Sequence, residues 1–252
     1  MAAILLHWKD RDVTLQYLQE LAYATMTKNQ HSRLRRAWSL LKKAVVARLF
    51  HRLFYDAGHY NKATWYDTYW FGSRTFKSPL DMWVYQEILY EKRPDVVVET
   101  GTSHGGSALY MAHIMDQLGY GSVITIDIDA AETPSHPRIT YVRGSSTDSA
   151  IVERIRAMTS GKQTMVVLDS DHSADHVLAE LSAYADLVSV GQYLIVEDTN
   201  LNGHPVYENY GPGPWEALKL FKRSDRRFKA DRTREKYLFT FNPGGFLLKA
   251  RD

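Results

Sequence analysis

The sequence contains no cysteine among its 252 residues. This absence excludes a disulfide framework, a thiol nucleophile and any metal centre ligated by cysteine, and it leaves the redox compartment open. No apolar run approaches the ~18 residues of a membrane span, and the N-terminal run Ala2–Leu6 is too short for the core of a signal peptide. The sequence therefore predicts a chain without a membrane span and, by default, a cytoplasmic one.

The chain also lacks an excess of charge of either sign. It has 31 basic and 29 acidic side chains, a formal net charge of +2. This balance is too small to indicate nucleic acid as a partner. Apolar residues make up 44% and charged residues 24%, as in an ordinary globular protein. The length fits one α/β domain with an N-terminal extension.

The first 60 residues are locally basic, with ten basic and four acidic side chains. Apolar residues recur there at spacings of three or four, which predicts an amphipathic helix: Leu34, Trp38, Leu41, Val45 and Leu49. A second helical pattern covers residues 14–27, and residues 58–77 are rich in aromatic side chains. The basic residues indicate a solvated helix face, with a subunit contact or a guide for an anionic substrate as alternatives. The aromatic segment suits core or oligomer packing, or a wall for a flat ligand.

Strand and helix patterns alternate after Pro94. The predicted strands are Asp95–Glu99, Ser122–Asp127, Ile139–Val142, Thr164–Leu168, Gln192–Val196, Tyr237–Phe241 and Gly245–Lys249. The predicted helices are Met82–Tyr90, Ser107–Gln117, Asp148–Met158, Ala174–Leu187 and Pro214–Phe221. Continuous apolar strands are typical of a parallel sheet buried on both faces. We therefore expect an α/β fold, a doubly wound and mostly parallel seven-stranded sheet ending in a hairpin, with a helical extension over 1–78 and the main domain over 79–252.

A glycine-rich loop follows the first predicted strand, with the sequence ETGTSHGGS from Glu99 to Ser107. Ligands bind at the carboxyl ends of strands in open α/β sheets, and Gly101 allows close approach of the backbone. The spacing differs from the dinucleotide pattern G-x-G-x-x-G, and the carboxylate of Glu99 suits an ammonium group better than a pyrophosphate. Asp127 ends the second strand, where a carboxylate can bind a ribose diol. A tight turn and a helix cap are the structural alternatives for these two features.

Acidic residues follow the next two long strands: Asp169, Asp171, Glu197 and Asp198. So many hard oxygen ligands at adjacent strand ends suit Mg²⁺ or Ca²⁺, the alternative being separate surface carboxylates. His172 and His176 are one helical turn apart but lack the H-E-x-x-H pattern of zinc proteases, so we favour a position on a helix surface for this pair.

Several runs of the sequence together resemble the cephalosporin hydroxylase/methyltransferase-like family of S-adenosylmethionine (SAM)-dependent enzymes. They are ETGTSHGGS from Glu99, LDSDH from Leu168, EDTN from Glu197, NGHP from Asn202 and GPGP from Gly211. The resemblance covers roughly Pro79 to the C-terminus. It implies a class I, Rossmann-like methyltransferase fold with Mg²⁺ held by three carboxylates. By matching position these would be Asp171, Glu197 and Asp198.

The same resemblance implies the cofactor site. Glu99, Gly101 and Asp127 would hold SAM. The remaining residues that we place in the cofactor site are Thr102, Ser107, Ser145 and Asp169.

We therefore expect a Mg²⁺-dependent O-methyltransferase whose small-molecule acceptor binds the ion through two adjacent oxygens. A bound metal lowers the pKa of an acceptor hydroxyl and orients it. Either His172 or His204 could be the general base, and the sequence does not choose between them. The alternatives are an NAD-dependent oxidoreductase and a non-catalytic SAM-binding protein. The N-terminal helix and the aromatic segment also predict a homo-oligomer.

Overall fold

The computed structural model describes residues 28–55, 57, 65–129 and 132–252. The predicted helix over 14–27 lies outside these residues. The chain forms two compact units, Met1–Arg48 and Leu49–Asp252. The predicted domain boundary at residue 79 falls inside the second unit.

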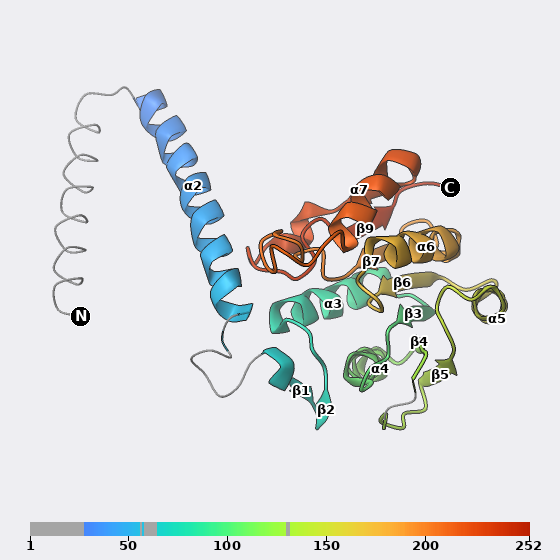
Figure 1. The fold of residues 1–252 in the computed structure, drawn as a ribbon. Helices are drawn as coiled ribbons and strands as arrows, with labels where there is room; N and C mark the ends of the chain where they lie inside the picture. The colour runs from blue at the N-terminus through green and yellow to red at the C-terminus, as the bar shows by residue number, and fades with distance from the viewer. Residues whose placement is uncertain (1–27, 56, 58–64, 130–131) are drawn as a thin grey trace. The chain divides into compact units, whose positions relative to one another are not determined.

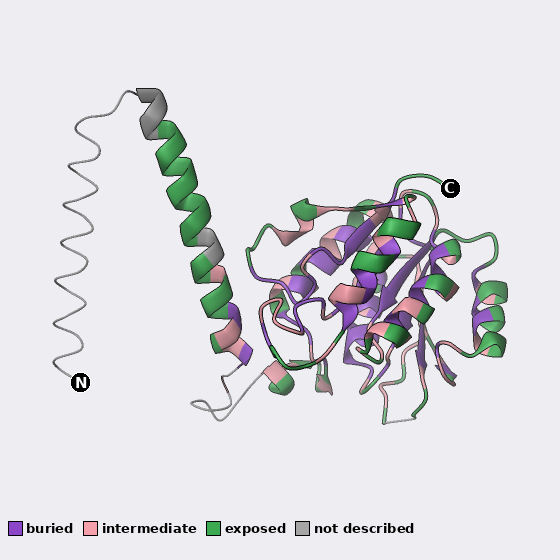
Figure 2. Ribbon diagram, turned by 45° about the horizontal axis from the view of Figure 1, so that its top comes forward, coloured by how far each residue is buried: buried purple, intermediate pink, exposed green. Residues whose placement is uncertain are grey.

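One long helix, α2 (Lys28–Tyr55), begins in the first unit and ends in the second. It confirms the helix predicted from the spacing of apolar residues, although apolar side chains outside the predicted stripe, such as Leu40 and Val46, are exposed as well. The five residues of that stripe, Leu34, Trp38, Leu41, Val45 and Leu49, are each 40–55% exposed. The described length of α2 carries basic side chains and no acidic ones. The apolar stripe is therefore exposed, on a helix that is exposed over most of its described length (Figure 2).

The second unit is built on a seven-stranded sheet with the order β5-β4-β3-β6-β7-β9-β8 (Figure 1). Five strands are parallel: β3 (Val96–Thr100), β4 (Ser122–Asp127), β5 (Ile139–Arg143), β6 (Thr164–Leu168) and β7 (Tyr193–Val196). β9 (Phe246–Lys249) pairs antiparallel with β7, and β8 (Phe228–Ala230) pairs antiparallel with β9. The predicted fold class is confirmed.

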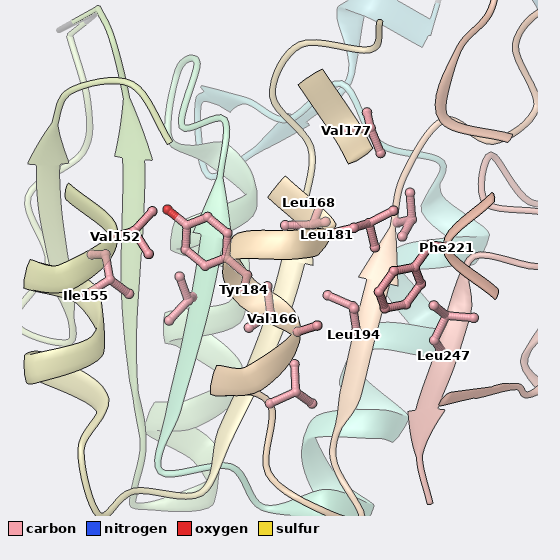
Figure 3. Close-up of a cluster of buried hydrophobic side chains, with 14 of the residues drawn as sticks. Val152, Ile155, Val166, Leu168, Val177, Leu181, Tyr184, Leu194, Phe221 and Leu247 are labelled. Carbon is pink, nitrogen blue, oxygen red and sulfur yellow. The ribbon is translucent and has the colours of Figure 1, made fainter. Parts of the chain in front are cut away.

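Helices cover both faces of the sheet because the central strands are apolar on both sides. Two of them, α3 (Pro79–Lys92) and α4 (Gly106–Leu118), pack on one face over Val97, Met165 and Ile195. On the other face lie α5 (Ser149–Thr159), α6 (Ala174–Tyr184) and α7 (Pro214–Ser224), over Val96, Val166 and Leu194 (Figure 3). Alternate residues of one strand thus enter opposite cores, as the period of a β-strand requires.

Shorter elements complete the unit. They are the hairpin β1 (Tyr69–Trp70) and β2 (Ser73–Arg74) and the 3₁₀ turns η2 (Trp65–Asp67), η3 (Ala185–Leu187) and η4 (Arg232–Glu235). None of the helices in the described residues is long and apolar enough to cross a membrane.

The predicted strand Tyr237–Phe241 is wrong, because the strand that pairs with β9 is β8. The aromatic side chains of the mispredicted segment serve a different core. Phe239 and Phe241 pack with Tyr55, Leu201 and Val206. The backbone amide of Phe241 donates to the buried carboxylate of Asp81 (2.8 Å) rather than to a neighbouring strand. A side chain therefore replaces the sheet as hydrogen-bond partner here.

Candidate active site

A cavity of about 500 Å³ opens at the carboxyl ends of the parallel strands. It lies beside the point where the chain order of the sheet reverses, between β3 and β6, which is where open α/β sheets bind ligands. Its walls are Gly101 and Ser103 after β3, Ile126–Ile128 at β4, Gly144–Ser146 after β5, and Asp169–Asp171 with His176 after β6.

The loop after β3 passes so close to the next strand end that only glycine fits at position 101. Gly101 has a φ of +86°, and a Cβ atom there would lie 1.8 Å from the carbonyl oxygen of Asp169. Its amide donates to the carbonyl of Ile126 (2.8 Å), so the loop is tied to β4 as well. The glycine predicted from sequence thus holds three strand ends together at the cavity wall.

Asp127 lies in the cavity wall with its carboxylate already oriented by backbone amides. Oδ2 accepts from the amide of Ser103 (2.8 Å), and Oδ1 accepts from that of Asp129 (3.1 Å). Each carboxylate oxygen has a second lone pair for a ligand hydroxyl. The arrangement suits a ribose diol.

Glu99 lies beneath the glycine loop and is fully buried. Its two oxygens accept hydrogen bonds from Ser107 Oγ (2.6 Å) and Thr125 Oγ1 (2.8 Å). Burial raises the pKa of Glu99 to about 7, although the Lys77 ammonium opposes the shift. The hydroxyl oxygens of Thr102 and Thr125 lie 2.7 Å apart and share a hydrogen bond. Glu99, Thr102 and Ser107 form a layer behind the loop, whereas Gly101, Ser145 and Asp169 line the cavity.

A cluster of potential metal ligands lies beside the cavity at the ends of β6 and β7. Within the residues that the structure describes, Asp169, His172 and Asp198 are the one group of at least three such side chains, with ligand atoms within 4.8 Å of one another. His172 Nε2 lies 3.4 Å from Asp169 Oδ1 and 3.2 Å from Asp198 Oδ2. Burial disfavours a charged imidazole, but the two carboxylates outweigh it and raise the pKa of His172 to about 9. The imidazolium therefore balances a site with an excess of negative charge.

The ammonium of Lys77 balances the negative charge on the other side of this cluster. Its Nζ donates to Asp169 Oδ2 (2.7 Å) and to Glu197 Oε1 (2.6 Å), and the side chain is 5% exposed. Burial opposes the charge, but Asp169 and Glu197 hold the pKa of Lys77 above its usual value. Glu197 Oε1 also accepts from the hydroxyl of Tyr85. Glu197 is thus held by Lys77 and Tyr85, next to the Asp169–His172–Asp198 cluster rather than within it.

The remaining predicted residues lie farther from that cluster. Asp171 is exposed, and its Oδ1 accepts from the amide of Ser173 (2.7 Å) just before α6. His204 Nε2 lies 3.0 Å from Glu216 Oε1, and its ring stacks on Trp215 with centroids 4.0 Å apart. The structure therefore brings His172 to the carboxylates and places His204 at the start of α7.

Asp198 has an unusual backbone conformation that its neighbours maintain. Its φ is +52°, a left-handed value tolerated by Asp at some energetic cost. The amide of Asp198 donates to Asn242 Oδ1 (3.0 Å). Two residues on, the buried Asn200 donates from Nδ2 to His51 Nε2 and to Tyr55 Oη, both at 2.9 Å. The last turns of α2 therefore support the loop that carries Asp198.

Several residues of the site were not found by sequence reasoning, among them Lys77, Ser146 and His176. No local pattern marks Lys77, which is separated from Asp169 by 92 positions. His176 was assigned to a helix surface, yet it lines the cavity. The one available signal was its position in the first turn of the helix after a strand that ends in acidic residues.

Comparison with known proteins identifies relatives over most of the chain. The profile of the family described as Rhamnosyl O-methyltransferase/CmcI matches residues 62–250. The Rhamnosyl O-methyltransferase of Mycobacterium tuberculosis (strain H37Rv) is 43% identical over 205 residues, which cover 77% of this chain and 83% of that protein. The Mycobacterium leprae protein of the same name is 41% identical over 204 residues, 77% of this chain and 89% of its own length.

Solved structures share the fold. The structure of CmcI with Mg and SAM has a TM-score of 0.59 and 23% sequence identity, and the match covers 74% of this chain and 78% of that one. This likeness shows that the two chains share a fold. The chain belongs to the Rhamnosyl O-methyltransferase/CmcI family and is a SAM-dependent O-methyltransferase, as the sequence predicted.

Proposed function

We propose that this enzyme transfers the methyl group of SAM to a sugar hydroxyl, of the rhamnosyl type named for its relatives, and that the reaction depends on Mg²⁺. The observation that carries the proposal is the 43% identity to a Rhamnosyl O-methyltransferase over 83% of its length. The carboxylate cluster beside the cavity supports the metal dependence.

The donor atoms of the cluster fit a hard divalent ion. Mg²⁺ is usually bound through one or two carboxylates together with waters or substrate oxygens. We propose Asp169 and Asp198 as the ligands. This choice keeps Asp198 from the trio Asp171, Glu197 and Asp198 expected from the sequence and adds Asp169, which was expected in the cofactor site; Glu197 is held by Lys77 and Tyr85, and Asp171 is exposed before α6. The close spacing of the two proposed ligands agrees with this choice, because the ligand atoms of Asp169, His172 and Asp198 lie within 4.8 Å of one another and could bind one ion. When bound, the ion would lower the pKa of an acceptor hydroxyl and orient it.

The protein's own contribution is mainly orientation. We propose that Asp127 binds the ribose hydroxyls of SAM, while Gly101 lets the cofactor lie against the backbone. Methyl transfer then forms a bond between the acceptor oxygen and the methyl carbon as the carbon–sulfur bond breaks in line, so alignment lowers the barrier. We propose His172 rather than His204 as the group that accepts the acceptor's proton, because the His172 ring lies at the carboxylates whereas His204 is held by Glu216 and Trp215. This role requires the neutral ring, so a bound metal ion would first have to replace the imidazolium as the positive charge beside Asp169 and Asp198.

The test uses the purified full chain with SAM and a methyl rhamnoside as the acceptor. We expect formation of S-adenosylhomocysteine and of an O-methylated rhamnoside, loss of both with excess chelator, and recovery with Mg²⁺. Full turnover in excess chelator would overturn the metal dependence. No methylation of rhamnosides together with turnover of another hydroxyl compound would overturn the acceptor class.

We also propose a homo-oligomer in which the apolar stripe of α2 contacts a second copy. Half-exposed Leu, Val and Trp side chains in one row on a helix support this, because such a row is normally buried in an interface. Replacing Leu41 with Glu should reduce the mass measured by light scattering, whereas Ser39→Glu on another face of α2 should not. A monomeric wild-type chain at micromolar concentration would overturn the proposal. The cytoplasmic location stays a prediction of the sequence.

A further inference from the structure

The loop between β7 and α7 contains two sequence runs to which the reaction described above gives no role, NGHP from Asn202 and GPGP from Gly211. Both runs converge on one carboxylate, Glu216, in the first turn of α7. Glu216 Oε1 accepts from Asn202 Nδ2 (3.1 Å) and lies 3.0 Å from His204 Nε2. Glu216 Oε2 accepts from the amide of Gly213 (2.8 Å). One side chain therefore holds the beginning and the end of this loop together.

The attachment is strong because Glu216 stays charged. Burial opposes the charged form, but the hydrogen bonds that the carboxylate accepts outweigh it and lower the pKa of Glu216. Hydrogen bonds to an ionised acceptor are about twice as strong as those between neutral groups. The end of the loop is also tied to α6, because the carbonyl of Pro212 accepts from the amide of Ala174 (3.1 Å). The loop therefore has a fixed position next to the segment that carries His172.

Tyr210 lies in this loop, beside the cluster of potential metal ligands. Its ring lies against the backbone of Gly213, where a Cβ atom would be 3.6 Å from the ring and 3.3 Å from the carbonyl oxygen of His172. Burial, followed by the carboxylates of Asp171 and Asp198, raises the pKa of Tyr210. The hydroxyl is therefore close enough to both carboxylates for their charge to act on it. Tyr210 is nevertheless 46% exposed, so part of its ring is open to a ligand.

Tyr210 and the proposed cofactor site belong to different strand ends. The residues that line the cavity assigned to SAM come from the ends of β3, β4, β5 and β6, whereas Tyr210 follows β7. Asp127, the proposed ribose ligand, ends β4, and the sheet order places β4 and β7 on opposite sides of β6. In-line transfer requires the acceptor oxygen and the leaving sulfur on opposite sides of the methyl carbon. Tyr210 is therefore on the side from which an acceptor would reach the cluster.

A half-exposed tyrosine at this place suits a sugar. In the proposed function two adjacent hydroxyls of the acceptor face the metal ion, which leaves a face of C–H bonds on the sugar ring. Such C–H groups are apolar and weakly positive, and they pack against the negative face of an aromatic ring. A 6-deoxy sugar such as rhamnose adds a methyl group to this apolar surface. Tyrosine supplies the contact area at a low cost in conformational entropy.

We propose that the ring of Tyr210 binds the C–H face of the acceptor sugar and that Glu216, by holding the loop, positions that ring. The inference deepens the proposed function and rests on it. It makes Tyr210 a determinant of acceptor binding and Glu216 a positioning residue that touches neither substrate nor cofactor. The contact is made by the ring and not by its hydroxyl, so phenylalanine should be able to replace Tyr210.

The test measures steady-state kinetics of the full chain with SAM and a methyl rhamnoside at saturating Mg²⁺. Tyr210→Ala should raise the KM of the acceptor about tenfold through loss of one aromatic contact, while the dissociation constant of SAM stays within about twofold. Tyr210→Phe should keep the wild-type KM. Glu216→Gln should also raise the KM of the acceptor. The double variant should be no weaker than Tyr210→Ala alone, because a residue that acts through another adds nothing once the other is removed.

The control is Tyr90→Ala, which removes another exposed tyrosine, on α3, and should keep the wild-type KM. An unchanged acceptor KM in Tyr210→Ala would overturn the proposal, as would a Tyr210→Phe variant as weak as Tyr210→Ala. Equal losses of SAM and acceptor binding would overturn it too, because the variants would then only disturb the fold. Additive effects in the double variant would refute the positioning role of Glu216.

The same experiment separates this inference from the proposed function. If the wild type methylates another hydroxyl compound and no rhamnoside, the proposed acceptor class fails, and the variants are measured with the compound that is methylated. If the wild type methylates rhamnosides and Tyr210→Ala has the wild-type KM, the proposed function stands and the role of Tyr210 fails.

Discussion

The stability of the unit Leu49–Asp252 should depend on pH through His51, a buried histidine near the end of α2. The ring is 5% exposed and lies against Phe239, with ring centroids 4.5 Å apart. Its Nε2 accepts the hydrogen bond from Asn200, which requires the neutral ring. Burial lowers the pKa of His51 from 6.5 to about 4.

The sign and size of the effect follow from this shift. Between pH 6.5 and pH 4 the unfolded chain holds a proton on His51 that the folded chain does not, so the free energy of unfolding falls as the pH falls. The stabilisation is complete above pH 6.5. With 1.36 kcal/mol for each pKa unit, the loss is about 2 kcal/mol at pH 5 and about 3 kcal/mol at pH 4.

The assay is urea unfolding followed by circular dichroism at pH 8 and pH 5. Other groups titrate in the same range, so the measured quantity is the difference between the wild type and His51→Gln, whose amide oxygen can accept the same hydrogen bond but does not titrate. The wild type should lose about 2 kcal/mol more than this variant between the two pH values. A control, His104→Gln on a partly exposed loop, should behave as the wild type. Equal pH dependence of the wild type and His51→Gln would refute the reasoning.

Three substitutions at the site should separate cofactor binding from metal binding. Gly101→Ala should abolish SAM binding and lower the unfolding temperature, because its Cβ would lie 1.8 Å from a backbone oxygen; calorimetry and thermal melts check this, and Gly72→Ala, with open space around it, is the control. Asp127→Ala removes charge-assisted hydrogen bonds worth ~1.5–3 kcal/mol each and should weaken SAM at least about tenfold, so unchanged affinity in a titration would contradict its ribose role. Asp198→Asn should raise the Mg²⁺ concentration needed for half-maximal turnover while leaving SAM affinity within about twofold, since it loses an anionic ligand outside the cofactor cavity; wild-type Mg²⁺ dependence would contradict its assignment.

The parallel core of the fold was predictable because its signal is local. Continuous apolar runs such as Val96–Val98 occur only where both faces of a strand are covered, and the observed strands agree with the predicted ones to within two residues at each end. The failure at Tyr237–Phe241 has a tertiary cause. Alternating aromatic residues predict a strand, but here they pack with the end of α2 and the loop after β7.

The site residues that directly follow strands could be predicted from the order of the strands. The residues that reach the site through tertiary packing could not. Asp127, Asp169 and Asp198 follow strands whose carboxyl ends share one edge of the sheet, so their proximity follows from topology. Lys77 and His176 reach the site through contacts that no short motif encodes. The predicted site contained more acidic groups than basic ones. That excess of negative charge indicated that a cation, which the structure identifies as Lys77, had to lie close by.

Lys77 also determines how much of the chain is needed for a working enzyme. A shortened chain that began at Pro79 would retain every strand of the main sheet and every carboxylate, histidine and glycine predicted to bind SAM or the metal ion or to act as the base. It would nevertheless leave Asp169 and Glu197 facing each other in a buried space without the ammonium that now separates them. A residue shortly before α3 thus supplies the counter-ion of the carboxylates at the ends of β6 and β7. A shortened version of this enzyme must therefore include Lys77 as well as the strands and helices of the main sheet.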